Sequence, residues 1–192
     1  MDFMALQLSG GGAAIGNHPL FCNGANLGFV KESWLEAIKV QDGSNLASGD
    51  DVFLLHAFKK IGLKTLYLKE RNATVKTLPA DSWQHFLRQR IRWGGKSKSY
   101  NDIETMLLAI LVFSTNLLLV LAPLSLIFGS SFWMALIVGF LLKFAVDIAL
   151  LKAGESFFNY RISWLTFFFY SILYPFYIVY TALAGFLCKE KW

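Results

Sequence analysis

The longest uncharged stretch of the chain, from Thr105 to Leu142, constrains its fold more than any other feature of the sequence. A transmembrane helix needs about 20 predominantly apolar residues, so this stretch is too long for a single crossing. The turn-forming triplet Gly129-Ser130-Ser131 divides it. We therefore expect one membrane helix over Thr105–Phe128 and a second over Phe132–Leu151.

A third apolar run, Ile162–Cys188, follows an expected loop over residues 152–161 and is interrupted by Pro175. Three full crossings would place Lys189 and Lys191 opposite the basic residues that precede the first span, which goes against the positive-inside tendency. Splitting the last run at Pro175 into a re-entrant pair would remove the conflict. Three spans are nevertheless what we expect.

Composition and charge also indicate a multi-pass integral membrane protein. Of the 192 residues 55% are hydrophobic, the mean hydropathy is +0.47, and 13 of the 18 basic residues lie before Thr105. The basic cluster Arg88–Lys98 adjoins the first span, as it does on the cytoplasmic side of membrane proteins. It does not form the basic run interleaved with aromatic residues that nucleic-acid binding would favour, so we expect no nucleic-acid partner.

Few residues of the apolar half could carry chemistry. Lys143 and Asp147 are four residues apart in the second expected span, so each can neutralise the other, and we expect them near its end. The two cysteines, Cys22 and Cys188, are far apart and lack partners at metal-binding spacing. No disulfide, no zinc site and no metal ligand set is therefore predicted.

The first half of the chain has the alternation of an α/β domain. Short strands are predicted for residues 27–30, 65–68 and 73–78, and a short helix for Lys31–Lys39. A stronger helix opens at Ser48, has Asp50 and Asp51 in its first turn and stops at Gly62. The glycine-rich segment 9–12 is expected to be a loop.

The segment from Asp81 to Trp93 is predicted to be an amphipathic helix capped by Asp81 or Ser82. Its aromatic side and its basic side suit a helix that lies along a bilayer surface. An ordinary surface helix leading into the membrane is an equally good interpretation. The predicted organisation is thus an α/β domain over residues 1–80, an interfacial helix over 81–104 and a membrane region of about three helices over 105–188.

Three short motifs precede the membrane region, and their order and spacing resemble the C-terminal part of a membrane-bound family 2 glycosyltransferase, the family of cellulose, chitin and hyaluronan synthases. In this sequence they read Phe21-Cys22-Asn23-Gly24-Ala25-Asn26-Leu27, Ser48-Gly49-Asp50-Asp51 and Gln89-x-x-Arg92-Trp93. The resemblance covers nearly the whole chain. It implies part of a GT-A fold, followed by membrane helices.

The same resemblance implies roles for individual residues. Asp51 would be the general base that activates an acceptor hydroxyl for attack on a nucleotide-sugar with inversion. Gln89 and Arg92 would contact the departing diphosphate. The acceptor, a glycan or glycolipid, would be bordered by Trp93, Asp50, Asn23, Gly24 and Asn26. The location implied is a bacterial inner membrane, with these residues on its cytoplasmic side.

One departure from the family pattern concerns the cofactor. The family holds a divalent metal, Mg or Mn, with an Asp-x-Asp motif in a nucleotide-binding half, and the present sequence contains no Asp-x-Asp. We therefore expect these residues to be a fragment that does not transfer sugar alone. A non-catalytic membrane scaffold derived from such an enzyme is the main alternative. A small transporter would rest only on Lys143 and Asp147.

Overall fold

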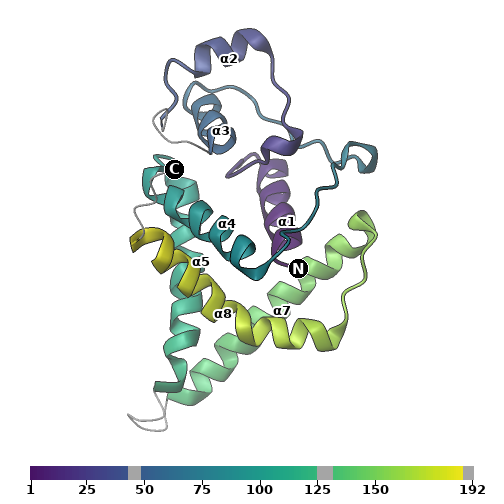
Figure 1. The fold of residues 1–192 in the computed structure, drawn as a ribbon, viewed down its shortest axis with the longest axis vertical. Coiled ribbons are helices and arrows are strands. Elements are labelled where there is room, and N and C mark those ends of the chain that lie inside the picture. The colour runs from purple at the N-terminus through teal and green to yellow at the C-terminus, as the bar shows by residue number, and fades with distance from the viewer. Residues whose placement is uncertain (43–48, 125–131, 188–192) are drawn as a thin grey trace. The chain divides into compact units, whose positions relative to one another are not determined.

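The computed structural model describes residues 1–42, 49–124 and 132–187, and the part it describes is helical throughout, with no strand (Figure 1). The predicted α/β fold, including the partial GT-A domain, is therefore wrong. The chain divides into two compact units: residues 9–109 with the end of the last helix from Ala184, and residues 1–8 with 110–183. The helices are α1 (Asp2–Ile15), α2 (Lys31–Ala37), α3 (Asp50–Lys60), α4 (Trp83–Lys96), α5 (Ile103–Leu121), α7 (Phe132–Phe158) and α8 (Trp164–Leu187), with single 3-10 turns at Gly24–Asn26, Arg71–Ala73, Ser97–Ser99 and Ala122–Leu124.

The three predicted strands are extended or turn segments without a paired neighbour in the described chain. Alternation of polar and apolar residues favours extended backbone, but a strand also needs a second strand to exchange hydrogen bonds with. Some apolar side chains of these segments remain in solvent: Leu66 is 81% exposed and Leu78 is 94% exposed. The prediction of extended backbone was therefore correct, and the prediction of a sheet was wrong.

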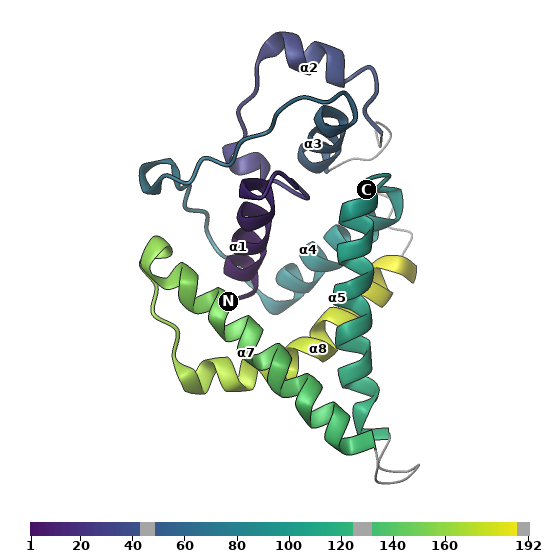
Figure 2. The same cartoon turned by 180° about the vertical axis from the view of Figure 1, so that it is seen from behind.

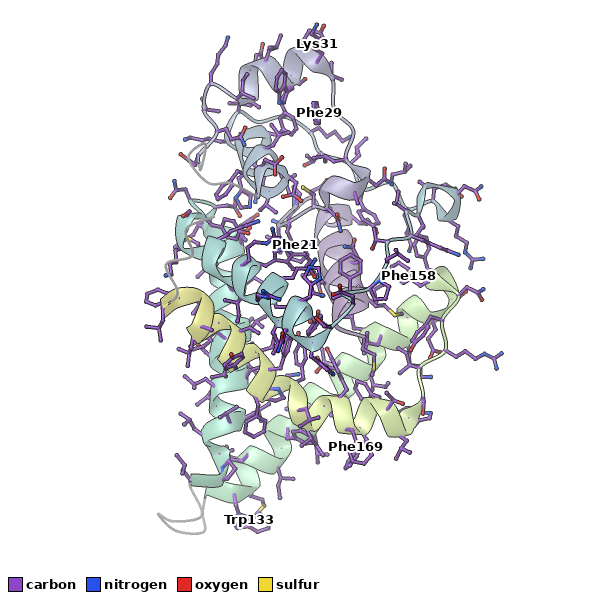
Figure 3. The ribbon with its side chains drawn as sticks, in the orientation of Figure 1. Phe21, Phe29, Lys31, Trp133, Phe158 and Phe169 are labelled. Carbon is purple, nitrogen blue, oxygen red and sulfur yellow. The ribbon has the colours of Figure 1, made fainter. Side chains whose placement is uncertain are left out.

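The glycine-rich segment 9–12 lies inside α1, so the predicted loop is also wrong. Here the glycines make room for aromatic rings. A Cβ on Gly10 would lie 2.6 Å from the ring of Phe21, which is labelled in Figure 3, and one on Gly11 would lie 2.7 Å from the ring of Tyr67. The helix can hold these rings against its backbone because both positions lack a side chain.

The helix ends were predicted more accurately. Asp50 and Asp51 occupy the first turn of α3, and Gly62 follows its end with a φ of 73°. Ser82 caps α4, since its hydroxyl accepts a hydrogen bond from the backbone N–H of His85 at 3.2 Å. Ser48, the expected cap of α3, lies outside the described residues.

A small core joins α2 and α3. It consists of Ala37, Leu54, Ala57 and Phe58, with Trp34 and Ile61 packed around it. On α3 these are the apolar positions that the helical period selects, whereas Leu35 of α2 and Ile38 directly after it are 43% and 40% exposed. The other end of α3 is tied to the start of α5 by charges, because Lys59 Nζ lies 2.5 Å from Asp102 and 3.0 Å from Glu104.

Three helices are long and apolar enough to cross a membrane: α5 with its final 3-10 turn, α7 from Trp133, and α8. The expectation of three such helices is confirmed, but α7 continues through the predicted loop to Phe158. Lys152 and Glu155 explain the extension, because they pair at 2.8 Å across one helical turn. The helix ends where Asn159 adopts a left-handed conformation with a φ of 51°.

Lys143 and Asp147 form the expected ion pair. They lie well inside α7 because the helix is longer than predicted, so the placement near its end is wrong. The helix α8 runs unbroken through Pro175, which rules out two separate half-helices. Transmembrane helices tolerate such a proline when neighbouring groups satisfy the freed carbonyl.

The helix α4 meets the last turns of α8 at two glycines. A Cβ on Gly185 would lie 2.6 Å from both the backbone N of Gly95 and the carbonyl oxygen of Ile91. Lys98 donates a hydrogen bond to the carbonyl oxygen of Phe186 and lies over its ring, 4.3 Å from the centroid. Backbones can approach this closely only where side chains are absent.

We expect Gly185→Ala to lower the free energy of unfolding by about 1–3 kcal/mol, because the added methyl group would meet rigid backbone on α4. Urea titration of the protein in detergent micelles measures this change. Gly139→Ala on α7 is the matched control, since a Cβ there would have no neighbour within 4 Å. Equal effects of the two substitutions would show that the contact between α4 and α8 is not tight.

Candidate functional site

The candidate site is built around Asp51 in the first turn of α3. Its Oδ2 accepts a hydrogen bond from the backbone N–H of Gly24 at 2.9 Å, and its Oδ1 accepts one from Val52 at 2.9 Å. Asp51 is half-buried, whereas Asp50 beside it is exposed. Free N–H groups and the helix dipole favour negative charge at this end of a helix. The carboxylate is therefore fixed in one orientation before any ligand arrives.

The turn from Asn23 to Asn26 contains Gly24, whose N–H binds Asp51. Asn23 caps the turn by accepting from the backbone N–H of Ala25 at 3.0 Å, and Asn26 donates to the carbonyl oxygen of Ala73 at 2.5 Å. The first two sequence motifs thus form one local structure, joined by the hydrogen bond from Gly24 to Asp51.

Lys96, which the sequence motifs do not include, brings positive charge to the same helix end. Its side chain lies against Gly49, so that a Cβ there would be 2.9 Å from Cδ and 3.3 Å from Nζ. Burial, and then Arg92, lower the pKa of Lys96, while Asp51 and Asp50 oppose this shift. All four charged groups are thus close enough to act on one another.

Gln89 and Trp93, the other two residues of the third motif, both contact Arg90 on α4. The guanidinium of Arg90 lies 4.2 Å from the ring centroid of Trp93, and its Nη1 donates to Oε1 of Gln89 at 3.4 Å. Gln89, Arg92 and Trp93 are each half-buried. Arg92 and Lys96 are four residues apart and share one face of the helix. Arg92 is thus connected to the Asp51 site through Lys96, whereas the contacts of Gln89 and Trp93 described here are with Arg90.

Two further residues, Cys22 and Tyr100, contact Asp51 or its helix α3. The thiol of Cys22 donates to the carbonyl oxygen of Asp51 at 3.2 Å, and the Tyr100 ring packs edge-on against His56, with centroids 5.3 Å apart. Burial, together with the charge of Asp51, raises the pKa values of Cys22 and Tyr100 to about 12 each. Neither group is ionised near neutral pH, so neither can serve as a nucleophile or base there.

The divalent metal expected from the resemblance does not fit these residues. The ammonium group of Lys96 already supplies positive charge beside the acids. Among residues 1–42, 49–124 and 132–187, no group of three or more His, Cys, Asp or Glu side chains could hold a metal ion. No chemical step is therefore derived through a metal.

The sequence could have suggested only part of this site. Lys96 follows Arg92 by one helical turn, and Cys22 directly precedes Asn23, so both had a positional signal. Tyr100 had none, because it reaches the site only through the packing of the segment after α4 against α3.

No protein-family model, curated protein or solved structure matches the chain.

We expect Cys22 to react with iodoacetamide about 10³-fold more slowly than an ordinary thiol at pH 8. A thiol whose pKa is near 12 is almost entirely protonated at that pH, whereas an ordinary thiol has a pKa near 8.5. The measurement uses a Cys188→Ser variant, in which Cys22 is the only thiol, and follows alkylation by mass spectrometry. The same variant in denaturant should react rapidly, and fast alkylation of the folded protein would contradict the buried geometry.

Proposed function

We propose that the chain is the acceptor-side and membrane part of an inverting glycosyltransferase. It would act at the cytoplasmic face of a bacterial inner membrane and transfer a sugar from a nucleotide-sugar to a lipid-linked or polysaccharide acceptor. The observation that carries this proposal is the 2.9 Å hydrogen bond between the N–H of Gly24 and Oδ2 of Asp51. It joins two motif segments, far apart in sequence, around one oriented carboxylate.

In the proposed reaction the acceptor hydroxyl attacks the anomeric carbon of the donor sugar. A carbon–oxygen bond forms there as the bond to the nucleoside diphosphate breaks, and the diphosphate leaves with the bonding electron pair. The hydroxyl proton passes to Asp51. Each carboxylate oxygen has two lone-pair directions, so an oxygen that accepts one backbone N–H can still accept this proton.

The cations beside Asp51 have a matching role. The departing diphosphate gains negative charge as the bond breaks, and preorganised positive groups stabilise that charge most where water is scarce. Lys96 is half-buried beside the acids, and Arg92 lies one turn away on the same face of α4. In this proposal both side chains meet the diphosphate, while the turn from Asn23 to Asn26 and Trp93 border the acceptor.

We expect Asp51→Asn to lower sugar transfer by about 10²–10⁴-fold, since an amide cannot accept the proton. The assay follows incorporation from a panel of radiolabelled nucleotide-sugars in membranes of the source cells, with the substitution made in the chromosomal gene. Glu36→Gln on α2 is the matched control, because it makes the same acid-to-amide change at an exposed position. Unchanged incorporation in the Asp51 variant would favour the alternative of a non-catalytic membrane scaffold.

We expect Lys96→Gln to lower transfer by about 10²-fold, because it removes a cation from the leaving-group side. Lys96→Arg, which keeps the charge, should retain much more activity. Lys60→Gln is the control, since Lys60 lies at the exposed end of α3. Transfer by Lys96→Gln at the rate of this control would remove Lys96 from the proposed mechanism and leave the role of Asp51 to be judged separately.

A further inference from the structure

The last helix, α8, ends against the helix that precedes the first membrane span. Gly185 meets the backbone of Gly95 and Ile91, and Lys98 is bonded to the carbonyl oxygen of Phe186. Figure 1 and Figure 2 both show these last turns of α8 beside α4. The compact unit formed by residues 9–109 accordingly includes the end of α8 from Ala184.

The chain length between Lys98 and α5 limits how far this contact lies from the start of the first span. Ile103, the first residue of α5, is only five residues from Lys98. Five residues span at most about 18 Å even when fully extended. The hydrocarbon core of a bilayer is about 30 Å thick. The end of α8 therefore cannot lie across a full membrane from the start of α5.

The start of α5 is an aqueous end. Asp102 precedes the helix, and Glu104 in its first turn is bonded to His18 at 2.7 Å and to Lys59 at 3.0 Å. Such a group of charges belongs outside the hydrocarbon core. If α5 crosses the membrane away from this side and α7 crosses back, a third crossing would end α8 on the far side. The contact with α4 requires α8 to end on the near side.

The residues of α8 suit a helix that stays at the boundary between the hydrocarbon core and the water. Over the most apolar stretch of each helix, the mean hydropathy of α8 is 1.5, compared with 2.4 for α5 and 2.3 for α7. Tryptophan and tyrosine favour the level of the lipid headgroups, and α8 exposes one of each. Trp164 is 62% exposed and Tyr180 is 55% exposed.

An apolar stripe runs along α8 at helical spacing. Its members are between 40% and 68% exposed, and they are Leu165, Phe169, Ile172, Phe176 and Leu183; Phe169 is labelled in Figure 3. The side chains of Ser171 and Thr181 lie on other faces and donate to backbone carbonyls within the helix. An exposed apolar face of this kind can enter the acyl region of one leaflet while the end of α8 stays against α4.

We propose that α8 is an interfacial helix, which binds the lipid surface on the side where α5 begins and does not cross the membrane a third time. The chain would then cross twice, through α5 and α7. Lys189 and Lys191, which follow α8 in the sequence, would fall on the same side as the basic cluster Arg88–Lys98. This arrangement satisfies the positive-inside tendency, and it is independent of the proposed sugar transfer.

Sided cysteine labelling in sealed membrane vesicles tests this topology. Single cysteines are placed at Lys98→Cys, Ser130→Cys and Lys191→Cys in a Cys22→Ser, Cys188→Ser background, and a membrane-impermeant maleimide is added from one side. We expect Lys191→Cys to be labelled from the side that labels Lys98→Cys and not from the side that labels Ser130→Cys. Labelling of Lys191→Cys together with Ser130→Cys would establish a third crossing and overturn the proposal.

A cross-linking measurement checks the contact without relying on access of the reagent. Lys98→Cys and Phe186→Cys combined in the same background should form a disulfide when membranes are treated with an oxidant. The matched pair is Lys98→Cys with Ser130→Cys, which a crossing α5 would keep a membrane thickness apart. A disulfide in the first pair and none in the second supports the proposal. No disulfide in the first pair, with normal membrane insertion, would contradict it.

Discussion

The ion pairs of Lys59 tie α3 to the first membrane helix, and the position of the candidate site depends on them. Lys59 and Asp102 have side chains that are only 17% and 13% exposed, so their pairing is screened far less than a surface contact would be. Burial alone would raise the pKa of Asp102, but hydrogen bonds from Lys59 and Thr105 outweigh it and hold that pKa below its usual value. Asp51 lies two turns away from Lys59 on the same helix, so anchoring α3 at its end also fixes the carboxylate at its start.

A second contact, between α4 and α8, depends on close approach of two backbones at glycine residues. Gly95 and Gly185 let the backbones of α4 and α8 lie against each other. Lys96 is next to Gly95, so the helix contact that places α4 also places the cation beside the acids. A shift of α4 would therefore change the charge balance around Asp51. Packing between α4 and α8 and electrostatics at the candidate site are thus coupled through a single helix.

The proposed chemistry follows from this coupling. A base needs an oriented carboxylate, and a departing diphosphate needs fixed positive charge on its own side. The Asp51 site supplies the first through two backbone N–H groups and the second through Lys96, with Arg92 on the same helix face. Because Lys96 already places positive charge beside Asp51, the arrangement suits proton transfer better than metal binding.

The sequence by itself determined the features that depend on neighbouring residues. The three long apolar helices, the caps at Ser82 and Gly62 and the Lys143–Asp147 pair all follow from spacing along one helix, and each was predicted. The tertiary structure decided everything that needs contacts between distant segments. Extended segments formed no sheet because none of the described residues pairs with them, and the helix α1 packs Phe21 and Tyr67 against Gly10 and Gly11. Tyr100 and the end of α8 joined other elements only through packing, which no local pattern encodes.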